Sequence, residues 1–156
     1  MAIALTLQQY LATKGVEYDV VAHAPTMSSM RTAQASRVPG DRLAKAVVLK
    51  DDKGYLLAVI PASHRLELEY LAVLRKRQAT LATEQEIETL FRDCSRGAIP
   101  PIGAAYGMDC VIDDSIAEQP EIYFEAGDHG TLVHMTGERF ARLTAATQHG
   151  RFSRHA

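Results

Sequence analysis

The sequence predicts an α+β fold in which helices flank an antiparallel or mixed sheet. Two hairpins carry this prediction, because in each a short turn joins two apolar segments, over residues 44–61 and 121–135. Helical segments lie around these hairpins, without the regular strand–helix alternation that is typical of a parallel α/β sheet. With 156 residues, the chain has the length of a single domain.

The first forty residues are expected to form a helix, a strand and a second helix. Residues 7–14 have the pattern of a short amphipathic helix, which Gly15 would end. Residues 17–22 are typical of a strand. Residues 27–36 favour a helix, which the Pro-Gly pair within 38–41 would break.

The first hairpin is the clearest strand signal in the chain. Residues 44–49 and 55–61 are apolar, and the segment 51–54 between them (Asp-Asp-Lys-Gly) has the composition of a hairpin turn. The second arm is apolar on both of its faces, which predicts a strand in the centre of the sheet.

The middle of the chain is expected to form two helices with a short strand between them. Residues 66–76 favour a helix, and 78–82 favour a short strand. The segment Thr83-Glu84-Gln85-Glu86 is a capping box, which predicts that a helix begins there and runs to about residue 92.

The last third combines a loop, a strand, the second hairpin and a helix. Residues 97–103 are too rich in Gly and Pro to form a regular element, and 108–112 favour a strand. The second hairpin turns at 126–130, and Thr136 is expected to cap a final helix that runs to about residue 146.

The composition excludes several classes of protein. With 47% hydrophobic residues, 23% charged residues and a net charge of −2, the chain is neither disordered nor a general nucleic-acid coat. No apolar run approaches the ~20 residues of a membrane span, and the first residues lack the pattern of a secretory signal. Cys94 and Cys110 make no disulfide framework. We therefore expect a cytoplasmic protein that binds neither DNA nor a membrane.

Lys45 is the first candidate for a functional residue. Because side chains alternate along a strand, Lys45 would share a face with Val47 and Leu49. A lysine among apolar neighbours either reaches solvent from the end of the strand or projects into a cleft. In a cleft, its positive charge would hold a phosphate or a developing negative charge.

The loop 97–103 (Gly-Ala-Ile-Pro-Pro-Ile-Gly) is the second candidate. Glycine lets the main chain approach a ligand closely, and two prolines stiffen the curve. Such a loop can present N–H groups to a carbonyl oxygen or hold a water molecule. A plain surface crossover between a helix and a strand would have the same composition.

No metal site and no cofactor are expected. The chain has six histidines, but none has zinc-site spacing, and His129 and His134 would lie on opposite faces of a strand. There is no phosphate-binding P-loop, no dinucleotide fingerprint and no nucleophile elbow around Ser63 and His64. These residues indicate a pocket for a small ligand and do not name the ligand.

Three features occur in order along the chain. They are Lys45 at the start of an apolar hairpin, a Gly-x-x-x-Pro-x-Gly loop (Gly97, Pro101 and Gly103), and a late glycine-bearing hairpin followed by a helix. In this arrangement the chain resembles the YbaK/ProX family of aminoacyl-tRNA deacylases, which also occur as the editing domain inserted in bacterial prolyl-tRNA synthetases.

The resemblance implies one compact domain over residues 1–156. Its ordered core would span about 5–146, followed by a basic tail over 147–156. The fold implied is a mixed, largely antiparallel, barrel-like sheet flanked by helices.

The resemblance also implies hydrolysis, in trans, of the ester that joins a wrong amino acid to a tRNA, without a metal or cofactor. The partner would be the aminoacyl-tRNA 3′ end, with prolyl-tRNA synthetase as a further candidate. In this family the lysine that matches Lys45 engages the phosphate and ribose of the tRNA end. The loop that matches Gly97 and Pro101 helps to place the scissile carbonyl and the attacking water, and the terminal ribose hydroxyl often assists.

The chain departs from the family at the late hairpin. The editing domain of the synthetase has a histidine there, where an ungapped comparison places Glu125 in this chain, with His129 four residues later. Either His129 positions the water, or the ribose hydroxyl assists alone. The catalytic residues expected are therefore Lys45, Gly97, Pro101 and His129.

The substrate is expected to be a small amino acid on a proline tRNA. A pocket built from Met27, Met30, Val47 and loop backbone would fit alanine, serine, threonine, cysteine or 2-aminobutyrate, and would exclude the proline ring. The substrate-binding residues expected are Met27, Met30, Val47, Pro100, Ile102, Gly103, Glu125 and Gly127.

Two rival functions remain open. The first is hydrolysis of another acyl ester or thioester, which needs the loop but no tRNA end. The second is a non-catalytic module that binds an RNA end or a synthetase, which would retain Lys45 but be indifferent to the geometry of the loop.

Overall fold

The computed structural model describes residues 3–24, 26 and 28–156 of the chain. Its helices are α1 (Leu5–Lys14), α2 (Ser29–Ser36), α3 (Leu68–Arg75), α4 (Glu84–Leu90), α5 (Asp114–Ala117) and α6 (Gly137–Leu143). Its strands are β1 (Asp19–Ala22), β2 (Leu43–Asp51), β3 (Gly54–Pro61), β4 (His64–Leu66), β5 (Thr80–Leu81), β6 (Asp109–Asp113), β7 (Glu121–Glu125), β8 (Thr131–Thr136), β9 (Gln148–Gly150) and β10 (Ser153–His155).

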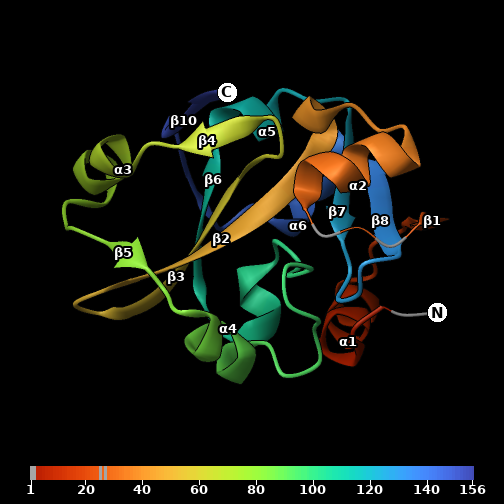
Figure 1. Ribbon diagram of the computed structural model, residues 1–156, viewed down its shortest axis with the longest axis horizontal. Coiled ribbons are helices and arrows are strands. Elements are labelled where there is room, and N and C mark those ends of the chain that lie inside the picture. The colour runs from red at the N-terminus through yellow and green to blue at the C-terminus, as the bar shows by residue number, and fades with distance from the viewer. Residues whose placement is uncertain (1–2, 25, 27) are drawn as a thin grey trace.

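The main sheet is mixed, as the α+β prediction requires. The strand order is β1-β8-β7-β2-β3-β6-β9, with β5 added beside β2, while β4 and β10 form a separate pair. Both predicted hairpins are present as antiparallel pairs, β2 with β3 and β7 with β8. Parallel pairs join β2 to β7 and β3 to β6, so the two hairpins lie in one sheet. Figure 1 shows β2 and β3 crossing the middle of the molecule, between α2 on one side and α4 on the other.

The β2–β3 hairpin folds as its sequence predicts. Its turn is held by the Asp51 side chain, which accepts a hydrogen bond from Lys53 N at 2.8 Å, and Gly54 has a φ of 125° that favours glycine. β3 lies between β2 and β6, so both of its edges are paired. Its residues from Leu56 to Ile60 are buried on both faces of the sheet, with Leu56, Ala58 and Ile60 in one core cluster and Leu57 and Val59 in others.

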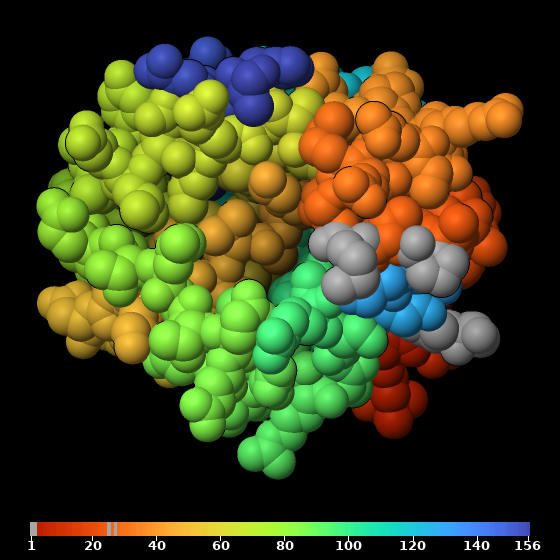
Figure 2. Space-filling view, in the orientation of Figure 1, coloured from red at the N-terminus to blue at the C-terminus, as the bar shows by residue number. Residues whose placement is uncertain are grey.

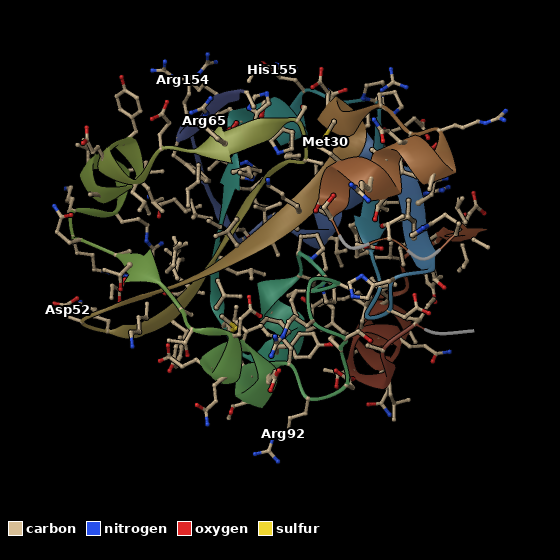
Figure 3. The ribbon with its side chains drawn as sticks, viewed as in Figure 1. Met30, Asp52, Arg65, Arg92, Arg154 and His155 are labelled. Atoms are coloured by element: carbon tan, nitrogen blue, oxygen red, sulfur yellow. The ribbon has the colours of Figure 1, made fainter. Side chains whose placement is uncertain are left out.

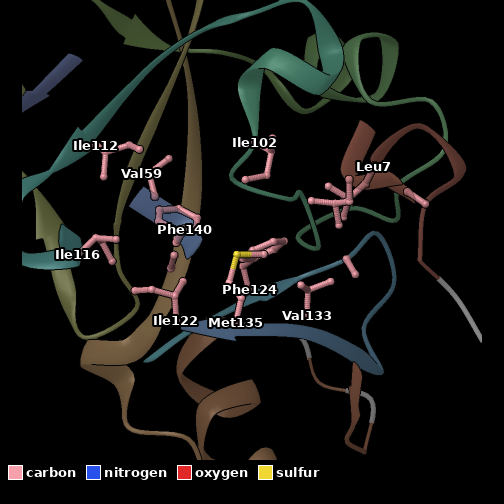
Figure 4. Close-up of a cluster of buried hydrophobic side chains, with 14 residues drawn as sticks. Leu7, Val59, Ile102, Ile112, Ile116, Ile122, Phe124, Val133, Met135 and Phe140 are labelled. Carbon is pink, nitrogen blue, oxygen red and sulfur yellow. The ribbon is translucent and has the colours of Figure 1, made fainter. Parts of the chain in front are cut away.

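The largest cluster of buried side chains lies between the sheet and helices α1 and α6 (Figure 4). Leu7 and Leu11 reach it from α1, Phe124 from β7 and Phe140 from α6. The capping signals are confirmed: Thr83 and Glu86 form the reciprocal capping box of α4, and the Thr136 side chain accepts a hydrogen bond from Arg139 N at α6.

The segment 147–156, expected as a basic tail, is instead part of the folded core. It forms β9, which pairs with β6, and β10, which pairs with β4. Between them Phe152 is 0% exposed, and its N–H donates to Asp113 Oδ1 at 2.8 Å. The same pairing corrects the helix predicted over 66–76, because β4 occupies its first residue and α3 begins at Leu68. None of the helices in the described part of the chain is long and apolar enough to cross a bilayer.

Candidate functional site

A cavity of about 260 Å³ opens over the middle of β2. Figure 2 shows a hollow near the centre of this face. There the β2 residues are recessed between the green residues around β5 and α4 and the orange residues of α2. The residues that line it are Ser29, Ala44, Lys45, Ala46, Val47, Val48, Leu81, Ala82, Glu84, Ile87, Gly97, Ile99 and Glu125.

The cavity coincides with a gap in the pairing of β2. On the edge that faces away from β3, β7 pairs with β2 up to Ala44, and β5 pairs with it from Leu49 onward. Ala62 N donates to Leu43 O, so the alternation of an antiparallel ladder turns the main-chain N–H and C=O of Ala46 away from β3. No backbone partner among the described residues takes them. Ala46 therefore leaves a donor and an acceptor on the strand edge that lines the cavity.

Lys45 lines the cavity from β2 and is half-buried. Burial lowers the pKa of Lys45, and no carboxylate among the described residues offsets that effect. Of the two orientations open from the sequence, the structure thus has the lysine at a cleft.

Gly97 brings the loop 97–103 to the cavity, together with Ile99. Its φ of 82° favours glycine, and a Cβ built at this position would lie 3.2 Å from Cε1 of His129. Within the described residues, the N–H groups of Gly97 and Ile99 have no main-chain acceptor. Both residues line the cavity.

The rest of the loop, residues 100–103, is packed in the protein interior and does not line the cavity. Pro100 and Pro101 are buried, and Ile102 is 2% exposed within the core cluster of Figure 4. Gly103 begins a short 3-10 helix and packs so closely that a Cβ would lie 2.9 Å from Met108 O. These residues hold the loop in place, so the approach of Gly97 to the cavity is fixed by packing behind it.

Glu125 lines the cavity at the end of β7 and is only 6% exposed. Its Oε1 lies 3.4 Å from His23 Nε2, and its Oε2 accepts a hydrogen bond from Thr32 Oγ1 at 3.3 Å. Burial raises the pKa of Glu125, while the nearby His23 and His129 oppose the rise. Lys45 and Glu125 therefore present opposite charges to one cavity, and no ion pair joins them.

The other predicted site residues fall into different places. Val47 lines the cavity, whereas Met27 lies outside the described residues. Met30 is turned away and packs against Gly40, where a Cβ would lie 3.1 Å from its Sδ; Figure 3 labels it near β4. Gly127 packs against Ala4 at the start of α1 and does not line the cavity.

His129 does not line the cavity, but its ring lies close to Gly97, where a built Cβ would come within 3.2 Å of Cε1. The neighbouring Asp128 is engaged elsewhere, because its Oδ1 accepts from Gly130 N at 3.0 Å and its Oδ2 from Thr131 Oγ1 at 3.3 Å.

Sequence reasoning missed His23, Thr32 and Ala46. His23 follows a strand with no motif around it, and Thr32 is a polar residue inside a helix, so neither gave a signal. Among the described residues, no three His, Cys, Asp or Glu side chains are grouped so that they could hold a metal ion. The cavity instead combines a cation, a carboxylate and free main-chain N–H groups, a set that can bind an anion, an ammonium group and a carbonyl oxygen.

Comparisons with known proteins agree on one family of folds. The family model of the aminoacyl-tRNA editing domain matches residues 23–143. A solved structure described as a candidate trans-editing enzyme for prolyl-tRNA synthetase is 24% identical, with a TM-score of 0.84 over 97% of this chain and 96% of that chain. No match was found among curated proteins.

Two further solved structures share the fold. A protein described as hypothetical is 19% identical, with a TM-score of 0.84 over 96% of this chain and 99% of that one. A candidate signal transduction protein from Marinobacter aquaeolei VT8 is 22% identical, with a TM-score of 0.76 over 96% of this chain and 30% of that one.

Proposed function

Because the chain belongs to the aminoacyl-tRNA editing domain family, we propose that it hydrolyses, in trans, the ester that joins a wrong amino acid to the 3′ end of a tRNA. The resemblance noted in the sequence is confirmed by the family match over residues 23–143. The observation that carries the proposal is Lys45, a cation with no carboxylate partner among the described residues, at a cavity that Gly97 also lines.

In the proposed reaction Lys45 binds the phosphate and ribose of the tRNA end, for which a compact point charge is suited. The free N–H groups of Gly97 and Ile99 stabilise the negative charge that develops on the carbonyl oxygen when water attacks. The C–O bond of the ester then breaks, and the ribose oxygen leaves with a proton. Pro101 acts through the loop, since it is buried behind Gly97.

The size of the cavity and the need for a second sieve support a small amino acid as the substrate. A synthetase rejects a side chain one methylene smaller by only ~1–3 kcal/mol, so errors with small amino acids escape it. A cavity of about 260 Å³, with Val47, Ile87 and Ile99 in its walls, suits alanine, serine, threonine, cysteine or 2-aminobutyrate. The similarity to a candidate trans-editing enzyme for prolyl-tRNA synthetase supports proline tRNA as the carrier and that synthetase as a partner in the cytoplasm.

A deacylation panel tests the proposal. Release of the amino acid is measured from proline tRNA charged with each of these residues, beside free aminoacyl esters and aminoacyl thioesters of the same amino acids. We expect turnover of the aminoacyl-tRNA to exceed that of the free aminoacyl ester and that of the aminoacyl thioester. Equal turnover of a thioester would support the rival acyl hydrolase, and binding of charged tRNA without release would support a non-catalytic module.

A tRNA that ends in 2′-deoxyadenosine tests the assistance of the ribose hydroxyl. If the hydroxyl helps the attacking water, the deoxy substrate should resist hydrolysis while it still binds. Normal turnover of this substrate would show that the ribose hydroxyl is not needed, and would favour a side chain as the group that positions the water.

A further inference from the structure

Glu125 has no part in the reaction proposed above, although it lines the same cavity as Lys45 and Gly97. A carboxylate that is 94% shielded from solvent is costly to keep in a protein unless something binds it. Its surroundings show how it is held and which groups remain free to bind a ligand.

The proton on His23 is fixed by its contacts. His23 Nδ1 lies 2.8 Å from Ala24 O, and a carbonyl oxygen only accepts, so Nδ1 carries a hydrogen. The opposite nitrogen, Nε2, faces Glu125 Oε1 at 3.4 Å. The imidazole of His23 at this distance opposes the rise that burial causes in the pKa of Glu125. His23 therefore stabilises the charged carboxylate from behind.

The second oxygen of Glu125 is held from α2. Thr32 Oγ1, which is fully buried, donates to Oε2 at 3.3 Å, and the Thr32 hydroxyl is in turn in contact with that of Thr26. His23 comes from the segment after β1 and Thr32 from α2, so two elements orient one carboxylate from β7. Each oxygen has one partner among the described residues, and a carboxylate oxygen can accept a second hydrogen bond.

The charged groups near Glu125 are His23 after β1 and His129 in the β7–β8 turn, with Thr32 as the polar contact from α2. Lys45 on β2 lines the same cavity. Lys45 does not pair with Glu125. Because Lys45 and Glu125 line one cavity without pairing, the cavity suits a ligand that has both a negatively and a positively charged group.

We propose that Glu125, positioned by His23 and Thr32, binds the α-ammonium group of the aminoacyl ester. The inference rests on the proposed function and adds the chemical group by which the substrate is recognised. An aminoacyl-tRNA end carries an ammonium group on the amino acid and a phosphate below the ribose. Glu125 and Lys45 would bind these two groups, with the ester between them at Gly97.

The consequence is selection for a free α-amino group. A site built to hydrogen-bond a polar group rejects an analogue that lacks it, because the buried partner is then left unpaired. Esters whose amine is replaced by a hydroxyl, or blocked as in peptidyl-tRNA, should therefore be poor substrates. The enzyme would hydrolyse aminoacyl-tRNA, in which the α-amino group is free, and would spare peptidyl-tRNA.

The experiment compares an aminoacyl-tRNA that the wild type hydrolyses with its α-hydroxyacyl counterpart, for example alanyl-tRNA with lactyl-tRNA, at single turnover. For the wild type we expect a preference of about 100-fold for the amino ester. Glu125→Gln should reduce this preference to within about threefold, mainly by slowing the amino ester. His23→Gln should reduce the preference in part, as a positioning residue would.

Glu121→Gln is the matched control, because Glu121 lies on the same strand and its Oε1 is in contact with His134 Nε2 outside the cavity. It should keep the full preference. Equal rates on both esters by the wild type would overturn the inference and leave the deacylase function intact, whereas no hydrolysis of any aminoacyl-tRNA would overturn the function itself. If Glu125→Gln does not fold, the wild-type ratio and the His23→Gln ratio still decide, since an unchanged ratio in His23→Gln contradicts its positioning role.

Discussion

β2 carries two lysines in contrasting surroundings. Lys50 Nζ lies 3.0 Å from Glu86 Oε2 at the exposed end of the strand, and this hydrogen bond raises the pKa of Lys50. Lys45, at the cavity, has no such partner among the described residues, and burial lowers its pKa. A lysine on this strand can thus form an ion pair, as Lys50 does with Glu86. Burial of Lys45 without a partner among the described residues disfavours its charge, and the negative charge of the proposed ligand would offset this cost.

The two acids show the same contrast. Glu86 accepts hydrogen bonds from Thr83 N, Tyr55 and Lys50, which lower the pKa of Glu86 to about 2. Glu125 lies at the cavity, and its burial raises its pKa. At the exposed end of β2, Lys50 and Glu86 pair with each other, whereas Lys45 and Glu125 at the cavity do not pair.

Replacement of the two lysines tests this contrast most strongly. Lys45→Ala should lower the rate of deacylation about 100-fold or more, the usual effect of losing one preorganised electrostatic contact. Lys50→Ala should change the rate less than about twofold, because an exposed ion pair contributes little. Single-turnover rates with melting temperatures check both. Lys45→Arg should restore only part of the activity, and full activity of Lys45→Ala would reject its role.

Two glycines with positive φ extend the contrast to the loop. Gly97→Ala and Gly107→Ala both force alanine into a left-handed conformation, at φ values of 82° and 68°, so both should lower the melting temperature similarly. Only at Gly97 would the new Cβ press on His129, whereas Gly107 has open space. We expect Gly97→Ala to lose at least about tenfold in rate and Gly107→Ala to retain it. Parallel losses of rate in both variants would make the loop purely structural.

His129→Ala should have a small effect on catalysis. The ring lies close to Gly97 and does not line the cavity, so we expect a change below about threefold, against the 10²–10⁴-fold of general acid–base help. The measurement is the pH–rate profile of wild type and variant. An acid limb present in the wild type and absent from His129→Ala would show instead that His129 takes part in proton transfer.

The smallest effect concerns stability. Burial places the pKa of Lys45 in the folded state below its value in the unfolded chain. Between these two pKa values the unfolded chain binds more protons, so stability rises with pH there. At neutral pH, below both values, charged Lys45 therefore lowers the free energy of unfolding. Lys45→Met should raise the melting temperature at pH 7 by on the order of 1–3 °C. The gain should shrink as pH rises through the lowered pKa. Lys50→Met, which removes the bond to Glu86, should give no gain, and a lower melting temperature of Lys45→Met would contradict the comparison.

Local signals in the sequence were sufficient for most of the fold. The apolar arms of the first hairpin and the capping box at Thr83 specify their structure within a few neighbouring residues. β4, β9 and β10 were missed because each has three mostly polar residues and no alternation, so their pairing depends on distant segments. Phe152, a lone aromatic residue in a polar segment, was the available sign that the end of the chain is buried.

The site was predictable in part. Lys45, Val47, Gly97 and Glu125 were expected, and the structure brings them to one cavity. The contacts of His23 and Thr32 with Glu125 join residues that are more than ninety positions apart in sequence. Such contacts follow from tertiary structure, and no spacing in the sequence encodes them.

The free main-chain groups of Ala46 have a consequence for inhibitor chemistry. An unpaired strand edge usually attracts another strand, but this one is bounded by β7 at Ala44 and by β5 at Leu49. An extended peptide would collide with both neighbours, whereas a single amide group could donate and accept at Ala46 alone. Compact amides that also carry an anion toward Lys45 are therefore the chemical starting point for blocking this cavity.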